Sequence, residues 1–593
     1  MDMQWNLNQL YDDFASAGFE RDFRKIDLLS KDLNQYISKN LNSFEQVRDK
    51  LEYIILKLIE FQTTYSLLDS YSRLSISVDA RNDQALSVIE QLEQKKTLLI
   101  KSMAKFQKWL ASINEVDSVI ASSQLLTEHR FFLEEMIEKS RYLLSDQEEY
   151  LIARLSINGA KAWEKLQQRL TATLMVDITV DGQNKKLPLS VIRNMAYEKK
   201  ATLRQAAYHA ELASYKNVED GVAASLNGIK GEVINITNIR GYKSPLVKTL
   251  LDSRLTEETL EIMLQAIKES LPHFHAFYQQ KARLLGHQNG LPFYDLFAPT
   301  GNSDLRFSYQ EAREFIVKNF RTFSNKLADY ADNAFAKNWI DAEPRTGKSG
   351  GAFCNNIHTI KESRILTNFD GSFNDVTTLA HELGHGYHGY CLEQESILNA
   401  DYPMPLAETA SILCETIVTD AALREAEPED AFNILETSLS DAGQVIVDIY
   451  SRFLFESEVF KLRKTSSLSV DQFKGLMINA QRKAYGDSLD PDYLHPYMWI
   501  CKPHYYSADL NYYNFPYAFG LLFGKGLYAK YRQEGKDFIK KYDQLLTVTG
   551  KREVSAVAQL MGIDLNHLDF WRDSLSLLEA DIFRFIEISN SKL

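Results

Sequence analysis

The sequence has few cysteines and lacks a long apolar run. Its 593 residues include only four cysteines, at Cys354, Cys391, Cys414 and Cys501, and their spacing shows none of the pairing of a cysteine metal site. Sparse, unpaired cysteines are typical of a reducing compartment. An apolar run of about 20 residues, the length needed to span a bilayer, is missing as well. We therefore expect a protein without a membrane partner.

Positive charge is also scarce. The formal net charge is −13, and lysines and arginines form no dense block. Because nucleic-acid binding depends on a concentrated basic surface, we expect no nucleic-acid partner. The stretch from Met1 to Phe19 has neither the basic start nor the apolar core of a signal peptide. Together with the cysteine content, this predicts a cytoplasmic location.

What the chain has in abundance is amphipathic helical pattern, so the predicted fold class is mainly α. In the first third, apolar residues recur every three or four positions, with charged residues between them. Two such series are Val47, Leu51, Ile54 and Leu58, and Leu92, Leu99, Met103, Phe106 and Leu110. The same texture returns after residue 250 and indicates a large helical protein.

A small β element interrupts the helices near residue 174. Two short alternating runs flank Asp181-Gly182, a dipeptide typical of tight hairpin turns. We place a domain boundary close to this hairpin. The prediction is a helical N-terminal region over residues 1–190, ending in the hairpin, and a second domain over residues 191–593.

The stretch TLAHELGHGYHG, from Thr378 to Gly389, carries the main chemical signal. His381 and His385 are four residues apart, so on a helix both imidazoles lie on one face and can reach one ion. Glu382 follows the first histidine, as in the H-E-x-x-H arrangement of zinc peptidases, where the glutamate is the general base. The segment SRILTNF is a predicted short strand, followed by a turn at Asp370-Gly371, and Asn374 or Asp375 is the expected N-cap of the helix.

A catalytic zinc site needs a third protein ligand. The stretch MPLAETASILCETIV predicts a second helix after Pro405, with Glu408 and Glu415 seven residues apart on one face. If this helix packs beside the first, Glu408 completes a set of two histidines and one glutamate, the interpretation that we favour. Glu415 is then either a partner that hydrogen-bonds a ligating imidazole or a surface carboxylate.

The metzincin extension of the motif is absent, because His388 and Cys391 occupy its Gly and His positions. His388 lies three residues after His385 and is interpreted as a hydrogen-bonding partner of the ligands or as a substrate contact.

A further cluster, over residues 494–520, gathers histidines and tyrosines. Neutral Tyr and His side chains can donate hydrogen bonds to the oxyanion that forms during peptide hydrolysis. Packing of an aromatic core is the alternative interpretation of this cluster.

The segments GGAFC, SRILTNFDGSFNDVTTLAHELGHGYH, LAETAS and HPYMWICKPHYY with YYNFPYAFG together resemble the M3 family of zinc metallopeptidases, in particular its oligoendopeptidase F group. The resemblance is strong over residues 190–580 and looser over the N-terminal third. It implies a helical shell around a deep substrate channel, one zinc ion per chain, and short peptides as substrates.

The resemblance also implies roles for individual residues. His381, His385 and Glu408 match the metal ligands, and Glu382 matches the catalytic base. His504 matches a histidine that holds substrate and the oxyanion, and the catalytic tyrosine is Tyr517 or Tyr513, with Tyr517 favoured. Gly351 and Ala352 in GGAFC match a stretch that contacts the substrate backbone. Independently of the resemblance, His388 and Tyr506 are further candidates for substrate binding.

The sequence therefore predicts a zinc-dependent endopeptidase that hydrolyses internal bonds of short oligopeptides. The alternatives are a helical zinc carboxypeptidase or dipeptidase with the same motif and, from a different class, a non-catalytic peptide-binding protein on the same shell. An aminopeptidase is not favoured, because a G-x-M-E-N stretch for capture of a free amine is missing.

Overall fold

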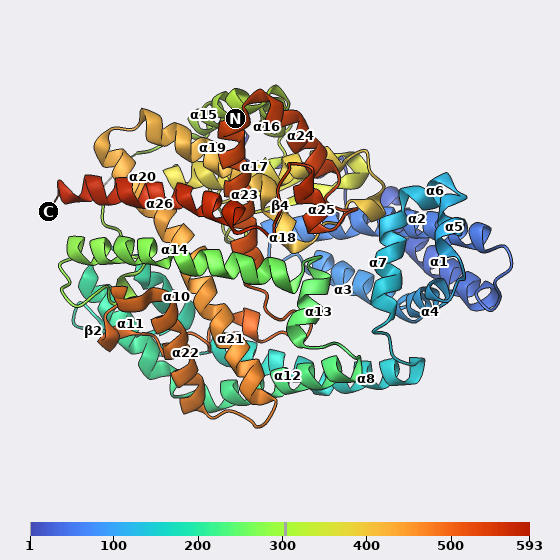
Figure 1. The fold of residues 1–593 in the computed structure, drawn as a ribbon, viewed down its shortest axis with the longest axis horizontal. Helices are drawn as coiled ribbons and strands as arrows, with labels where there is room; N and C mark the ends of the chain where they lie inside the picture. The colour runs from blue at the N-terminus through green and yellow to red at the C-terminus, as the bar shows by residue number, and fades with distance from the viewer. Residues whose placement is uncertain (1, 302–304, 593) are drawn as a thin grey trace. The chain divides into compact units, whose positions relative to one another are not determined.

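The fold of this chain, a computed structural model that describes residues 2–301 and 305–592, confirms the mainly helical class (Figure 1). Its strands are few and short. The backbone forms two compact units, each assembled from segments that are distant in the sequence. The first contains residues 1–146, 305–421 and 530–563, and the second contains residues 147–304, 422–529 and 564–593. The predicted boundary at residue 190 is not a limit of either unit and stays a prediction.

The first unit begins with a helical region whose apolar faces meet in one core. Leu51, Ile54 and Leu58 are buried there, as their spacing predicted, and Leu92 and Leu110 join them. The second predicted series is divided between two helices, with Leu99 in the break. These helices are α1 (Ala17–Asn40), α2 (Val47–Val78), α3 (Asp83–Thr97), α4 (Ile100–Ala111), α5 (Val116–Ala121), α6 (Gln124–Glu128) and α7 (Arg130–Ser140).

The middle segment of the first unit carries a three-stranded sheet of order β3-β5-β4. The predicted strand is β5, which pairs in parallel with β3 and antiparallel with β4, so β4 is an edge strand. The elements of this unit beyond residue 305 are α15 (Tyr309–Phe323), α16 (Asn325–Ala336), β3 (Ile340–Asp341), β4 (Phe353–Ile357), β5 (Glu362–Leu366), α17 (Phe373–Leu392), α18 (Met404–Ala407), α19 (Thr409–Glu425), α24 (Lys536–Thr547) and α25 (Val554–Gln559).

The second unit contains the predicted hairpin. β1 and β2 pair antiparallel with Val180 opposite Gln183, and both turn residues, Asp181 and Gly182, have positive φ. That conformation is what a two-residue hairpin turn requires, so the Asp-Gly prediction is confirmed. Val176 and Ile178 point into the core, whereas β2 lies at the surface.

Long helices make up the rest of this second unit. α14 packs against α26, and α9 against α12. The elements are α8 (Asp146–Asn158), α9 (Ala160–Ala172), β1 (Met175–Val180), β2 (Gln183–Pro188), α10 (Leu189–Asn194), α11 (Ala201–Tyr215), α12 (Glu219–Ile239), α13 (Pro245–Asp252), α14 (Glu257–Leu284), α20 (Pro428–Gly443), the π-helical turn η5 (Gln444–Asp448), α21 (Ile449–Arg463), α22 (Val470–Tyr485), α23 (Phe515–Glu534) and α26 (Leu568–Asn590).

None of the helices within residues 2–301 and 305–592 is long and apolar enough to cross a membrane.

Candidate metal centre

The start of α17 is fixed by a reciprocal cap. The Ser372 hydroxyl accepts from the backbone N–H of Asp375, and the Asp375 carboxylate accepts from the backbone N–H groups of Asp370, Gly371 and Ser372 at 2.9–3.0 Å. The predicted N-cap, Asn374 or Asp375, is therefore wrong by two to three residues. Asp375 instead closes the capping box from the third helical position. The cap anchors the turn that leads into the histidine-bearing part of the helix.

The three predicted ligands converge at one point. Glu408 Oε2 lies 3.2 Å from His381 Nε2 and 3.4 Å from His385 Nε2. One donor atom from each of these residues falls within 4.8 Å of the others. A tetrahedral zinc ion with bonds near 2.0–2.2 Å would hold its ligand atoms about 3.3 Å apart, so the spacing fits. Two imidazoles and one carboxylate are also a donor set of catalytic zinc sites.

Glu408 reaches this point from a break between two helices. The predicted second helix begins as α18, and Glu408 follows its last residue with φ −83° and ψ 2°. Its carbonyl then accepts from the backbone N–H of Ile412 in α19 at 3.1 Å, and its carboxylate accepts from the Ser411 hydroxyl at 2.8 Å. Glu408 and Glu415 are therefore not on one uninterrupted helix, because the chain turns at Glu408 to start α19.

A glycine lets α19 approach α17. A Cβ atom on Gly384 would lie 2.6 Å from the Ala410 carbonyl oxygen and the Ser411 Cα. Neither is the flexible end of a side chain, so even alanine at 384 would push the helices apart. The glycine inside H-E-L-G-H thus sets the distance between the histidines and Glu408.

Glu415 contacts the nitrogen of His381 that faces away from the cluster. Glu415 Oε2 lies 3.1 Å from His381 Nδ1. Burial lowers the pKa of His381, but Glu408 and Glu415 outweigh burial and raise it to about 10. Burial likewise opposes ionisation of Glu408, yet the two histidines bring its pKa well below the usual range. The site is therefore rich in negative charge and suited to a cation.

Glu382 is enclosed beside the cluster. Its side chain is buried, and its Oε2 has no hydrogen-bond partner among the described residues. Burial raises the pKa of this carboxyl, against the opposing effect of His381 and His385. A carboxylate with an unused oxygen and a raised pKa is able to accept a proton, as a general base must.

His388, one turn beyond His385, has no exposed surface. Its ring stacks on Tyr402 with centroids 4.0 Å apart, and its Nε2 lies 2.8 Å from the Thr549 hydroxyl. Burial, with a smaller contribution from His385, lowers its pKa to about 3, so the ring is neutral. His388 therefore has no surface that a substrate could contact. Its stacking on Tyr402 connects α17 to the segment that leads to Glu408.

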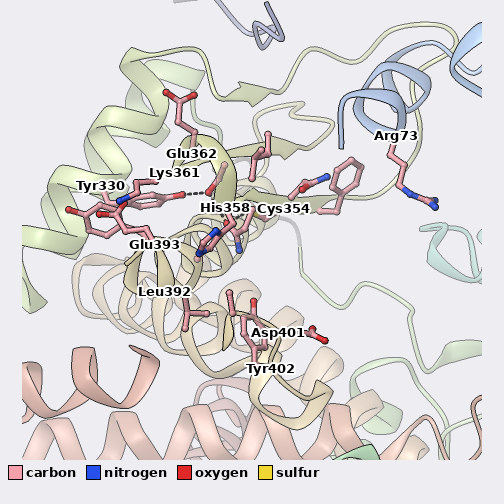
Figure 2. Close-up of a pocket in the computed structure, with 18 of the residues that line it drawn as sticks. Arg73, Tyr330, Cys354, His358, Lys361, Glu362, Leu392, Glu393, Asp401 and Tyr402 are labelled. Atoms are coloured by element: carbon pink, nitrogen blue, oxygen red, sulfur yellow. Dashed lines mark hydrogen bonds between the residues drawn. The ribbon is translucent and has the colours of Figure 1, made fainter. Parts of the chain in front are cut away.

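A cavity of about 710 Å³ opens along the edge strand β4 in this unit (Figure 2). Its wall includes Cys354, Asn356 and Tyr402, together with Arg73 of α2. Asn356 also donates to the backbone carbonyl of His385 at 3.0 Å, so the cavity starts one side chain from a predicted ligand. Sequence reasoning missed Asn356, since an asparagine in a short strand carries no signal of its own.

Gly351 and Ala352 immediately precede β4. Gly351 has a φ of +78° and its carbonyl accepts from the Asn368 side chain at 3.1 Å, which fixes the entry of the chain into the strand. The backbone of an edge strand is able to pair with an extended peptide. The substrate-binding role of Gly351 and Ala352 stays a prediction.

The aromatic cluster belongs to the second unit. His504 stacks on Tyr513 with centroids 5.4 Å apart, Tyr517 meets His504 edge-on at 6.4 Å, and the two tyrosine rings are 5.8 Å apart. Burial, and then the charges of Arg452 and Lys502, lower the pKa of His504, which keeps this imidazole neutral. His504 and the two candidate tyrosines therefore contact one another.

Two neighbours of this cluster have different surroundings. Tyr506 is buried, and its hydroxyl donates to the Trp499 carbonyl at 2.9 Å, so its polar end is already used. Tyr512 has a φ of +53°, a strained value for a residue other than glycine, and its ring packs on Phe453 and Phe460. This turn places Tyr513 on His504, and sequence reasoning missed it because backbone strain leaves no mark in the sequence.

Comparison with family models identifies one family. The model of "Peptidase family M3" matches residues 194–577, and that of "Oligopeptidase F" matches residues 109–175. An oligoendopeptidase F homolog from Borreliella burgdorferi is 22% identical over 573 residues, covering 95% of this chain and 94% of the relative.

Solved structures share the fold. A crystal structure from Chlamydophila abortus superimposes with a TM-score of 0.82 at 20% identity, covering 99% of this chain and 98% of that one. The crystal structure of oligoendopeptidase-F from Enterococcus faecium gives a TM-score of 0.73 at 17% identity, covering 97% and 99% of the two chains.

Proposed function

This chain belongs to peptidase family M3 and is a metallopeptidase of its oligopeptidase F group, and from that premise we propose that it is a zinc-dependent endopeptidase of short oligopeptides. The observation that carries the proposal is the convergence of His381, His385 and Glu408 on one point, with Glu382 enclosed beside them. Spacing, donor types and burial all fit a hydrolytic zinc site.

His381, His385 and Glu408 are the proposed ligands of one zinc ion per chain. Zinc bound there would supply a Lewis acid that polarises the scissile carbonyl and acidifies a water molecule. Glu415 fixes the ring of His381 through Nδ1, so that Nε2 points to the metal position. Because the other imidazole nitrogen is engaged, His381 binds in one defined tautomer.

Proton transfer is the proposed role of Glu382. Its unpartnered oxygen takes a proton from the attacking water and then delivers it to the leaving amine. His504, with Tyr517 or Tyr513, donates hydrogen bonds to the oxyanion that develops on the scissile carbonyl. Neutral donors suit this task, and the lowered pKa of His504 keeps its ring neutral.

The remaining predicted site residues concern substrate. We propose that the backbone at Gly351 and Ala352, continued by the edge of β4, pairs with an extended peptide, and that the adjoining cavity takes its side chains (Figure 2). His388 and Tyr506 are buried, so their support for peptide binding is proposed to be indirect, through Tyr402 and the Trp499 segment respectively.

Internally quenched peptides that are blocked at both ends test the endopeptidase assignment. Only an endopeptidase cleaves them, whereas a carboxypeptidase or dipeptidase needs a free terminus. We expect cleavage of the blocked peptides, its loss on chelation and its recovery with zinc. Cleavage restricted to free-ended peptides would favour the carboxypeptidase, and tight peptide binding without turnover in zinc-loaded protein would favour a binding protein.

A cytoplasmic location and a closed substrate channel are also part of the proposal. A channel enclosed by helices would admit short peptides and exclude long chains. A closed channel is tested by incubating the enzyme with a reduced, alkylated protein and, separately, with the tryptic fragments of that protein. The unfolded protein and its fragments share most of their peptide bonds and differ in chain length. We expect fast cleavage of the fragments only, and equal rates would argue against a closed channel.

A further inference from the structure

A second cavity, of about 180 Å³, lies inside the second unit. Its wall includes residues of α10, α11, α14, α20, α22 and the π-helical turn η5, and of the segments 196–197, 293–297 and 495–502. A buried cavity of about 150 Å³ is large enough for benzene, so this one has room for a small organic molecule. The wall combines polar side chains with the aromatic rings of Tyr197, Tyr208, Tyr278, Phe293, Tyr294, Phe297 and Tyr485.

The carboxylates in and around this cavity are neutralised in pairs. Glu211 accepts from Arg193 Nη1 at 2.8 Å, and Asp448 forms an ion pair with Arg452. Behind the wall, Asp295 accepts from Arg204 Nε at 2.7 Å. Burial raises the pKa of Glu211, but His495 and Arg193 outweigh it and lower it to about 2, so Glu211 is charged. These pairs leave no net charge.

Lys502 is the exception. Its ammonium group lines the cavity and has no hydrogen-bond or ion-pair partner within the described part of the chain. Burial lowers the pKa of Lys502, and the positive charge of Arg452 lowers it further, whereas the negative charge of Asp448 opposes both effects. A half-buried lysine without a partner is costly, because the ammonium group loses water without gaining an acceptor. Lys502 thus gives the cavity a basic side chain that no carboxylate contacts directly, although Asp448 is near enough to attract it.

Two hydroxyls add donors without partners. Tyr278 and Tyr485 both line the cavity, with ring centroids 5.4 Å apart, and neither hydroxyl has a hydrogen-bond partner in residues 2–301 and 305–592. Gln444 and Asp448, the two ends of η5, line it as well. π-helical turns occur often at functional sites. An ammonium group and two free hydroxyls within aromatic walls match a ligand that has a negative end and an apolar body.

We propose that this cavity binds a small carboxylate with a short apolar or aromatic body, its charge held by Lys502 and its oxygens by the hydroxyls of Tyr278 and Tyr485. The carboxylate comes either from a free small acid or from an acidic group of a peptide. Binding can be measured without turnover, because Lys502, Tyr278 and Tyr485 are not among the residues proposed to hold zinc or to carry out the peptidase reaction.

Binding of sodium benzoate and benzamide to the full-length chain, stripped of metal, tests the proposal. The two probes have nearly the same shape, and only benzoate is charged. Titration calorimetry at constant ionic strength should show saturable binding of benzoate and at least tenfold weaker binding of benzamide. Lys502→Met should weaken benzoate at least tenfold and leave benzamide unchanged, whereas Lys483→Met, an exposed lysine on α22, should match the parent.

Tyr485→Phe removes only a hydroxyl and keeps the test decisive if Lys502→Met does not fold. It should weaken benzoate severalfold without changing the affinity for benzamide. No benzoate binding, equal binding of the two probes, or parental affinity in both variants would overturn the proposal. Competition by chloride at the same concentration as benzoate would also overturn it, since the cavity would then take any small anion.

The two sources of the carboxylate are separated by kinetics of the zinc-loaded protein. If the ligand is an acidic group of a peptide, benzoate competes with substrate, and Lys502→Met raises KM for a glutamate-containing peptide but not for its glutamine analogue. If the ligand is a free acid, benzoate binds without competing. Because the binding measurements use metal-free protein, failure of the peptidase proposal would not affect them.

Discussion

The metal-ligand cluster on α17 and the aromatic cluster around His504 are held together by different kinds of contact. In the first, directional polar contacts fix side chains, as Glu415 does for His381 and Ser411 for Glu408. In the second, His504, Tyr513 and Tyr517 meet ring against ring. A metal site needs ligand atoms at set positions, whereas oxyanion donors must keep their polar hydrogens available for substrate. Loss of a residue should therefore have different consequences in the two clusters.

The largest effect is expected from Glu408→Ala. It leaves two imidazoles, so both the affinity for zinc and the turnover of blocked peptide should fall sharply, and excess zinc should restore part of the rate. Metal content after dialysis, measured together with turnover, gives the result. Parental zinc affinity in this variant would place the third ligand elsewhere, and Glu415 would be the next candidate.

Glu382→Gln separates chemistry from metal binding within the same cluster. The variant keeps the shape and the three ligands but removes the base, so zinc should stay near one per chain. Turnover should fall by about 10²–10⁴-fold, the range for loss of acid–base catalysis. Substantial turnover in metal-replete variant protein would exclude Glu382 as the base.

The aromatic cluster is tested by Tyr517→Phe and Tyr513→Phe. Loss of one oxyanion donor should cost about 2.7–4 kcal/mol in the transition state, or about 10²–10³-fold in kcat, with zinc content unchanged. We expect this loss in one of the two variants, and first in Tyr517→Phe. The exposed Tyr150 in the same unit provides a Phe control. Parental kcat in both variants would mean that the cluster serves only packing.

A smaller effect is expected from Glu415→Gln. The glutamine amide can still contact His381 Nδ1, but the substitution removes the negative charge of the Glu415 carboxylate. Affinity for zinc should therefore fall about 10- to 100-fold. Competition with a chelator measures this change, and kcat at saturating zinc should change less than in Glu382→Gln. An unchanged zinc affinity would make Glu415 a plain surface carboxylate.

The sequence predicted most where function depends on local spacing. The H-E-x-x-H register places His381 and His385 on one helical face through backbone geometry alone, and Asp181-Gly182 forms its turn for the same reason. The helix start was missed, since Ser372 and Asp375 form a reciprocal cap that competes with the simpler choice of N-cap.

What depends on distant segments could not be predicted. Asn356 reaches the His385 carbonyl only through the pairing of β4 with β5, and the interleaving of the two units leaves no pattern in the chain. The unpaired Lys502 looks like any other lysine in the sequence. Only the folded structure shows that Arg193 and Arg452 pair with the neighbouring carboxylates, Glu211 and Asp448, so that Lys502 has no direct partner.

The zinc X-ray absorption spectrum of the purified, active protein tests the central claim most directly, because it reports the atoms bound to the metal. The account predicts one zinc per chain with nitrogen and oxygen neighbours at about 2.0–2.2 Å, including the multiple-scattering pattern of two imidazoles. In Glu408→Ala, the number of oxygen and nitrogen neighbours from protein should fall by one. Sulfur neighbours at about 2.3 Å, or an unchanged spectrum in that variant, would contradict the assignment.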